Sequence, residues 1–195
     1  MNPTHQHTGT LEGELVSRAG TGDTRAFEEL YQLYEQRVYH YICTLVRDAT
    51  LAEEVLGDVM LAVWRGAQHF AHQSRVSTWI FGIARHKAFD ALRRTGRHEQ
   101  HAVALDEAPD LPCRQDSPIE QIHREQLGVV ARKALAKLSG EHQEVLRLVF
   151  YEELPYEEIA RLLDIPENTV KTRVFYAKQQ LKRHLDRLIA KETVL

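Results

Sequence analysis

The feature that most constrains the fold is a short pattern near the C-terminus, in residues 155–181. Apolar residues at helical spacing predict a first helix over Tyr156–Leu163, with Ile159 on its buried side. A turn follows at residues 164–166, because proline cannot continue a helix but is accepted in the first turn of the next one. The segment therefore predicts a helix-turn-helix.

The second helix of this motif has an apolar side, which begins with Val170, Val174 and Ala177. Basic groups can neutralise phosphates, and Asn, Thr and Gln side chains can hydrogen-bond to base edges. We therefore interpret the remaining surface as a DNA-recognition surface, against the alternative of a solvated face in an ordinary helical bundle. Its candidate DNA-binding residues are Asn168, Lys171, Thr172, Arg173, Phe175, Tyr176 and Gln179.

The net charge of −3 conceals two basic segments separated by an acidic one. Residues 75–97 carry six arginines and lysines against one aspartate, and residues 168–191 carry seven against one. Residues 98–127 carry seven acidic residues against two arginines. This distribution indicates two separate surfaces that contact a polyanion.

Helical periodicity also dominates the N-terminal half of the chain. A stripe of aromatic and aliphatic residues predicts a helix that begins near Thr24, with Asp23 or Thr24 as its N-cap. A second apolar pattern predicts a helix from about Leu51, and a third predicts one from about Ser77 to residues 95–96.

Residues 96–119 lose this pattern and contain three prolines among acidic residues. We interpret them as a flexible linker between two domains. The sequence thus predicts an all-α protein with an N-terminal tail over residues 1–24, a first domain over 25–95 and a second domain over 120–191.

Several classes of protein do not fit this sequence. No apolar run approaches the ~20 residues of a membrane span, and no export signal begins the chain, so we expect a cytoplasmic protein without membrane insertion. Cys43 stands in the apolar run YICTLV, so we expect it to be buried. It is far from Cys113 in the sequence, so we expect no disulfide to form. No catalytic motif is present, and we predict that the protein is not an enzyme.

The eleven histidines raise the question of a metal site. Two pairs have the three-residue spacing that brings side chains together on a helix: His69 with His72, and His98 with His101. Neither pair has the cysteines or carboxylates that would complete a four-ligand site, so we expect no metal and no other cofactor.

Four segments in order resemble the extracytoplasmic-function (ECF) sigma factors of bacterial RNA polymerase. LPYEEIARLLDIPENTVKTRVFYAKQQLKRHL resembles their C-terminal promoter-binding domain, and AFEELYQLYEQRVYHYI resembles the opening helix of their first domain. LAEEVLGDVMLAVWR resembles the helix that docks on polymerase, and STWIFGIARHKAFDALRR the helix that melts the promoter. The match covers about residues 25–94 and 130–187.

The resemblance implies a function and partners. The protein would bind core RNA polymerase and direct promoter-specific initiation, with its first domain on the downstream (−10) element and its second on the upstream (−35) element. An anti-sigma factor is a further implied partner, because the family often works in that way. In the first domain the implied polymerase-binding residues are Glu53, Glu54 and Asp58, and the implied DNA-binding residues are Arg75, Trp79, His86 and Asp90.

Four positions depart from the family's usual residues, and they leave the base preference open. Gly57 stands where glutamine is usual, Gly82 where arginine is common, His86 where asparagine is usual, and Tyr176 where a basic residue is frequent. A conventional helix-turn-helix regulator, with an N-terminal sensing or dimerising domain, is the alternative function. The basic and aromatic segment 70–94 favours the sigma factor.

Overall fold

The computed structural model describes residues 4–96 and 130–192. Their helices are α1 (Thr4–Gly20), α2 (Thr24–Val46), α3 (Ala49–Gly66), the short 3-10 helix η1 (Ala67–His69), α4 (Val76–Arg94), α6 (Gly140–Phe150), α7 (Tyr156–Leu163) and α8 (Glu167–Glu192). Residues 130–136 form a further helical segment ahead of α6. The described residues contain no strand, which confirms the all-α prediction.

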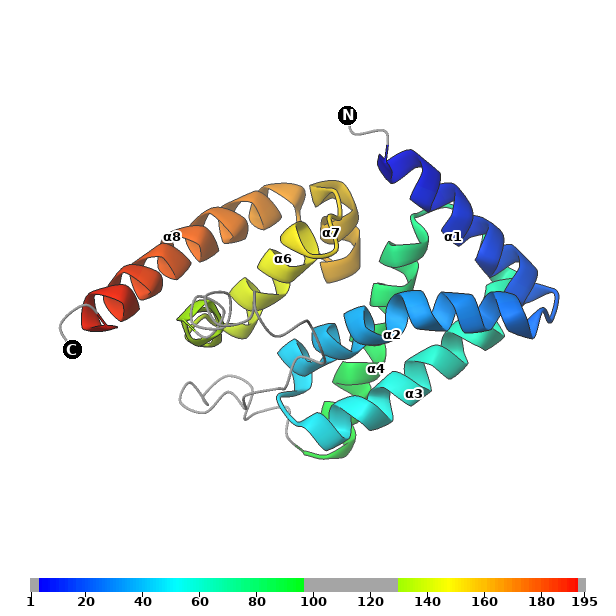
Figure 1. Ribbon diagram of the computed structural model, residues 1–195, viewed down its shortest axis with the longest axis horizontal. Helices are drawn as coiled ribbons and strands as arrows, with labels where there is room; N and C mark the ends of the chain where they lie inside the picture. Colours follow the sequence, from blue (N-terminus) through cyan, green and yellow to red (C-terminus); the bar gives the residue numbers. More distant parts are fainter. Residues whose placement is uncertain (1–3, 97–129, 193–195) are drawn as a thin grey trace, which may run out of the picture.

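Helices α1 to α4 form the N-terminal domain (Figure 1). Its core is rich in aromatic side chains. Tyr34, Tyr41 and Phe81 are fully buried where α2 meets α4. The Tyr41 and Phe81 rings meet edge to face with their centroids 5.2 Å apart. This arrangement is one that aromatic rings prefer, and it fixes α4 against α2.

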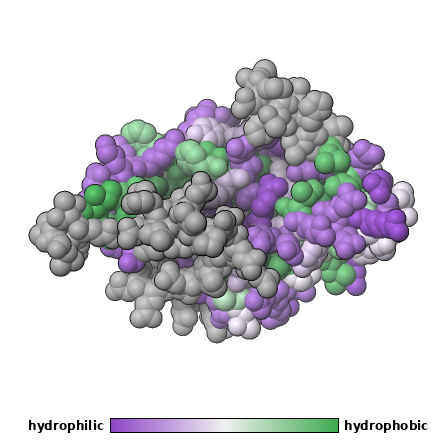
Figure 2. Space-filling view, viewed as in Figure 1, coloured by the Kyte–Doolittle hydropathy of each residue, from purple (hydrophilic) through white to green (hydrophobic). Residues whose placement is uncertain are grey.

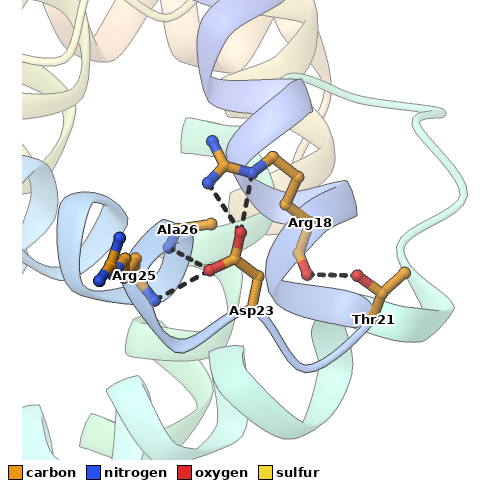
Figure 3. A network of polar contacts seen from close by, with 5 residues as sticks. All are labelled: Arg18, Thr21, Asp23, Arg25 and Ala26. Carbon is orange, nitrogen blue, oxygen red and sulfur yellow. Dashed lines mark hydrogen bonds and ion pairs between the residues drawn. The ribbon is translucent and has the colours of Figure 1, made fainter.

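A network of polar contacts closes the turn between α1 and α2 (Figure 3). The Asp23 carboxylate caps α2 by accepting hydrogen bonds from the backbone N–H groups of Arg25 and Ala26, at 3.0 and 3.1 Å. The Arg18 guanidinium also donates to this carboxylate, and it is the main reason that the pKa of Asp23 is lowered. Asp23 is thus the N-cap, one of the two residues that the sequence predicts for this position.

Helix α1 occupies much of the segment that the sequence analysis interprets as an N-terminal tail. It packs on α2 and on η1, and it buries Leu15, Val16 and Ala19. Near its end, a Cβ atom at Gly20 would lie only 2.9 Å from the backbone of Gln68 in η1. Glycine is therefore needed here for the close approach of two backbones.

Helices α6, α7 and α8 form the C-terminal domain, in which α7 and α8 are the predicted helix-turn-helix. Helix α7 has the predicted bounds, Tyr156–Leu163. Asp164 ends it in a left-handed conformation with φ of 56°, a position that Asp tolerates better than most residues. Ile159 of α7 and Val170 of α8 are fully buried and join the two helices.

The two domains lie against each other. Helix α6 packs on α2, and α7 packs on α4 (Figure 1). On the face drawn in Figure 2, hydrophilic residues are spread over both domains, with smaller hydrophobic areas among them. Three ion pairs cross this domain interface, and the buried apolar residues of the two domains belong to one cluster.

Some predictions concern residues beyond the described ranges. Almost all of the predicted linker, with Cys113, His98 and His101, lies outside them, and the predicted domain boundaries stay a prediction. Cys43 is buried, as predicted. In residues 4–96 and 130–192 no helix combines the length and apolar character needed to cross a membrane.

Candidate nucleic-acid interface

The first turns of α8 carry an exposed face of mixed chemistry. Lys171, Thr172 and Gln179 are exposed, and Phe175 and Tyr176 expose 56% and 52% of their surfaces. The two aromatic rings meet edge to face, with centroids 5.5 Å apart. Exposed rings beside a lysine suit apolar contact with a base or a thymine methyl.

Two of these side chains already make contacts within α8. The Lys171 ammonium lies 2.7 Å from a carboxylate oxygen of Glu167, one turn earlier. The Thr172 hydroxyl donates to the carbonyl of Asn168 at 2.8 Å, so its oxygen can still accept a hydrogen bond and its methyl group is free for apolar contact. Asn168 is exposed and keeps its side-chain amide for a base edge or phosphate.

Arg173 lies differently from the other candidate residues of α8. Only 26% of its side chain is exposed, and its guanidinium lies 3.3 Å from the carboxylate of Glu141 at the start of α6. It borders a shallow groove of about 270 Å³ together with His142, Asn168, Thr172 and other residues of α6 and α8. Arg173 therefore both ties α8 to α6 and lines the edge of the recognition surface.

In the N-terminal domain, three rings hold the loop between η1 and α4. Phe70 lies between His72 and Trp79, with ring centroids 4.7 Å apart on each side. A Cβ atom at Gly66 would lie 3.1 Å from the Trp79 ring, so glycine leaves room for this half-buried tryptophan. The implied DNA-binding residue Trp79 thus supports the loop that precedes its helix.

Helix α1 also reaches this loop, which the sequence analysis did not predict. The Ser17 hydroxyl oxygen lies 3.3 Å from Nε2 of His72, and it also donates to the carbonyl of Gly13. His72 itself has a left-handed backbone with φ of 54°. The pattern of residues 1–24 gives no hint of this contact, because it joins positions 55 residues apart.

Helix α4 has two polar faces with different surroundings. On one face, Nε2 of His86 lies 3.1 Å from the Asp90 carboxylate, which Arg93 also contacts, and His86 is exposed. On the other face, the C-terminal domain meets Arg75 at the start of the helix and Arg85 further along it. The four implied DNA-binding residues of this domain are therefore not equally accessible.

Helix α3 presents the implied polymerase-binding residues. Glu53 and Glu54 are exposed, and the partly exposed carboxylate of Asp58 lies 3.8 Å from the Arg94 guanidinium. Gly57 is exposed in the middle of this acidic face, and a Cβ atom there would meet nothing within 4 Å. One turn further on, Leu61 is an exposed apolar neighbour that the sequence analysis did not single out.

Among the described residues, no group of three histidine, cysteine, aspartate or glutamate side chains could hold a metal ion. His69 and His72, the pair that lies within the described range, are both exposed. His72 contacts Ser17 and the Phe70 ring, so its surroundings are those of a side chain that packs against α1 and the loop.

Comparisons with known proteins match both domains. The region 2 family of sigma-70 proteins matches residues 30–98, and the region 4 family matches residues 134–183. The ECF RNA polymerase sigma factor RpoE of Cereibacter sphaeroides is 31% identical over 84% of this chain and 88% of its own length. The RNA polymerase sigma-H factor of Pseudomonas aeruginosa is 28% identical over 93% of this chain and 97% of its own.

Solved structures show the same fold. The sigma factor RpoE of Bartonella quintana, solved with the anti-sigma factor NepR, has a TM-score of 0.63 at 23% identity, over 82% of this chain and 96% of its own. CnrH, solved with the cytosolic domain of CnrY, has a TM-score of 0.63 at 22% identity, over 91% of this chain and 98% of its own.

A charged helical domain followed by a helix-turn-helix domain, each matched to a sigma-70 region, defines a transcription initiation factor. This chain belongs to the family of ECF RNA polymerase sigma factors. It acts by binding core polymerase and directing it to promoters, which excludes the conventional helix-turn-helix regulator. Its relatives are transcription factors rather than enzymes.

Proposed function

We propose that the exposed face of α8 binds the upstream promoter element in the major groove. Lys171 holds a phosphate, while Thr172 and Phe175 contact base edges, with Tyr176, Gln179 and Asn168 around them. Arg173 steadies the helix from its pair with Glu141 and reaches the backbone at the groove edge. The observation that carries this proposal is the pair of exposed rings between Lys171 and Gln179 on a helix whose other side is buried.

The N-terminal domain holds the melted downstream element in this proposal. A base that leaves the stack needs a pocket with aromatic and basic groups, and the loop supported by Phe70 and Trp79 offers such surroundings. Arg75 neutralises a phosphate next to that loop. His86 and Asp90, which contact each other on the accessible face of α4, set the preferred base.

Glu53, Glu54 and Asp58 dock on a basic surface of core polymerase. Their support is the acidic, exposed face of α3, which continues into the exposed Leu61. An anti-sigma factor binds the protein when it is inactive, a proposal supported by the complexes in which two proteins of this fold were solved. The protein works in the cytoplasm with polymerase, without a catalytic activity or cofactor of its own.

Run-off transcription with core polymerase and a promoter library, randomised through both elements, tests these assignments. His86→Asn and His86→Ala are expected to shift the preferred base at one or two downstream positions, because an amide and an imidazole place their donors and acceptors differently. Identical downstream profiles for all three proteins would remove His86 from the DNA interface. Glu54→Lys is expected to lower transcription from every promoter equally, because it weakens binding to polymerase.

A further inference from the structure

The domain interface brings acidic side chains of the C-terminal domain onto basic side chains of the N-terminal domain. Three glutamates supply the negative charge: Glu144 of α6, Glu152 of the loop after α6, and Glu158 of α7. Their side chains expose only 7%, 1% and 13% of their surfaces. Buried carboxylates require partners, and each of these has at least two.

Glu158 lies against the start of α4. One carboxylate oxygen is 3.4 Å from Nε of Arg75, and the other accepts a hydrogen bond from the Thr78 hydroxyl. Arg75 also donates to the backbone carbonyl of Glu153, at 3.4 Å. The α7 region therefore gives Arg75 two acceptors in the place where the proposed function puts a phosphate.

Glu144 repeats the arrangement further along α4. A single carboxylate oxygen accepts from Nε of Arg85 at 3.1 Å and from the Tyr41 hydroxyl at 2.8 Å. Arg75, Thr78 and Arg85 are separated by three and seven residues, so they lie on one side of α4. That side is the one that packs on α7 and that Glu144 of α6 reaches.

Glu152 anchors the interface beside these contacts. Its carboxylate lies 2.9 Å from the Arg37 guanidinium of α2 and 3.6 Å from that of Arg147 in its own domain. Arg147 in turn donates to the backbone carbonyl of Arg37 at 3.3 Å. Paired charges of this kind are sensitive to the removal of one partner and fix a single geometry.

We propose that the C-terminal domain is an intramolecular partner of α4, whose carboxylates compete with promoter phosphates for Arg75 and Arg85. A carboxylate and a phosphate offer the same charge-assisted acceptors to a guanidinium, so one arginine cannot satisfy both. Because both partners belong to one chain, the carboxylates act at a high effective concentration. This inference rests on the proposed function, in which Arg75 contacts DNA.

The test measures binding of the full chain to short, fluorescein-labelled single-stranded DNA of randomised sequence. Glu158→Gln keeps the size of the side chain and removes its charge. Glu157→Gln is the matched control, because Glu157 is the neighbouring residue on α7 but is exposed and pairs with Arg161 of its own helix. Both variants change the net charge by the same amount, so any general attraction to DNA is equal.

We expect Glu158→Gln to bind roughly three- to fivefold more tightly than Glu157→Gln, the range of a partly exposed ion pair. This gain is expected to disappear when both variants also carry Arg75→Ala. Equal affinities for the two single variants would overturn the proposal. So would a gain that persists without Arg75, because the glutamate would then act in some way other than competition for this arginine.

Transcription by Arg75→Ala separates this inference from the function on which it rests. If Arg75→Ala transcribes normally with core polymerase, the assigned DNA contact of Arg75 is wrong and the competition fails with it. If Arg75→Ala is defective but Glu158→Gln binds DNA like its control, the contact stands and only the competition is overturned. Small-angle scattering gives an independent readout, in which Glu144→Gln/Glu158→Gln is expected to have a larger radius of gyration than the parent chain.

Discussion

The two basic segments of the chain differ in what their charged side chains contact. On α8, Lys171 and Arg173 pair with Glu167 and Glu141 of their own domain, and the aromatic face between them stays exposed. On α4, Arg75 and Arg85 pair with carboxylates of the other domain, although 52% and 29% of their side chains stay exposed. Similar net charges in the sequence thus correspond to one accessible surface and one that is occupied.

The difference shows that a charge count locates a polyanion-binding surface without showing whether it is available. Availability depends on residues far away in the sequence, since Thr78 and Glu158 are 80 positions apart. Under the proposed function, α8 meets duplex DNA without rearrangement, whereas Arg75 and Arg85 have to leave their carboxylate partners before they contact a phosphate.

The largest expected effect concerns the accessible surface. Phe175→Ala is expected to change which upstream elements are accepted, with a loss of roughly 1–3 kcal/mol at one base position, because a base contact disappears. Lys171→Ala is the contrast, since losing a phosphate contact lowers binding at all sequences and reduces the salt slope by about one. A promoter panel that both variants transcribe with one common profile would contradict the division of roles on α8.

The next effect concerns the domain interface. Arg37→Gln leaves the buried Glu152 carboxylate with Arg147 alone, so we expect the domain interface to lose about 1–2 kcal/mol. Both tryptophans lie in the N-terminal domain, so urea unfolding followed by fluorescence and by circular dichroism is expected to give separate transitions in this variant. Arg161→Gln, which breaks an exposed pair on α7, serves as the control, and coincident transitions in Arg37→Gln would show that Arg37 does not couple the domains.

A smaller effect is expected at Gly82, which lies between Thr78 and Arg85 on α4. A Cβ atom there would meet nothing within 4 Å, so alanine fits without disturbing the domain interface. Gly82→Ala is expected to stabilise the protein by about 0.5–1 kcal/mol, because glycine is a poor helix former. Thermal unfolding measures the gain, and a loss of stability would mean that α7 approaches this part of α4 more closely than the structure has it.

The smallest expected effect is a dependence on pH through His40 of α2. Burial, and then the positive charge of Arg147, lowers the pKa of His40 below its ordinary value of 6.5. The unfolded chain therefore takes up the proton first, so this contribution to stability is present above pH 6.5 and is lost as the pH falls through the folded pKa. Unfolding measured between neutral and mildly acidic pH is expected to show a smaller loss of stability in His40→Gln than in the parent chain.

His184→Gln is the matched variant for this measurement. Burial, with Lys137 and nearby arginines, also lowers the pKa of His184, but this histidine lies on α8 in the C-terminal domain. Small-angle scattering at the same pH values separates the effects of the two histidines, because only His40 lies beside Arg147, which contacts Arg37 across the domain interface. If the two variants change the scattering curve alike, His40 has no special influence on the contact between domains.

Local pattern was sufficient to predict the elements that carry the DNA-binding surfaces. Pro166 and the apolar spacing located the turn between α7 and α8, and Asp23 was one of two predicted caps for α2. These features depend on residues within a few positions of one another, where helical period and capping chemistry operate.

Other features could not be predicted in this way. Helix α1 has a weak amphipathic pattern and contains three glycines, so its formation depends on packing against α2 and η1. The contacts of Arg75 and Arg85 join them to partners across the linker, and neither residue differs in sequence pattern from an arginine that faces solvent. The DNA-binding residues of α8 were predicted from the chemistry of its exposed face. Those of the first domain, and the polymerase-binding residues, came from the family resemblance, and all of these assignments stay predictions.

The two sides of the domain interface are far apart in the sequence, and this distance has a consequence during protein synthesis. The partners of Arg75 and Thr78 are made about 4 to 16 seconds later, because ribosomes add roughly 5–20 residues per second and 80 positions separate Thr78 from Glu158. The N-terminal domain contains all the helices of its own core, so it can fold in this interval. Each nascent chain is therefore expected to present the unpaired arginines of α4 to the nucleic acid around the ribosome for several seconds before the C-terminal domain can pair with them.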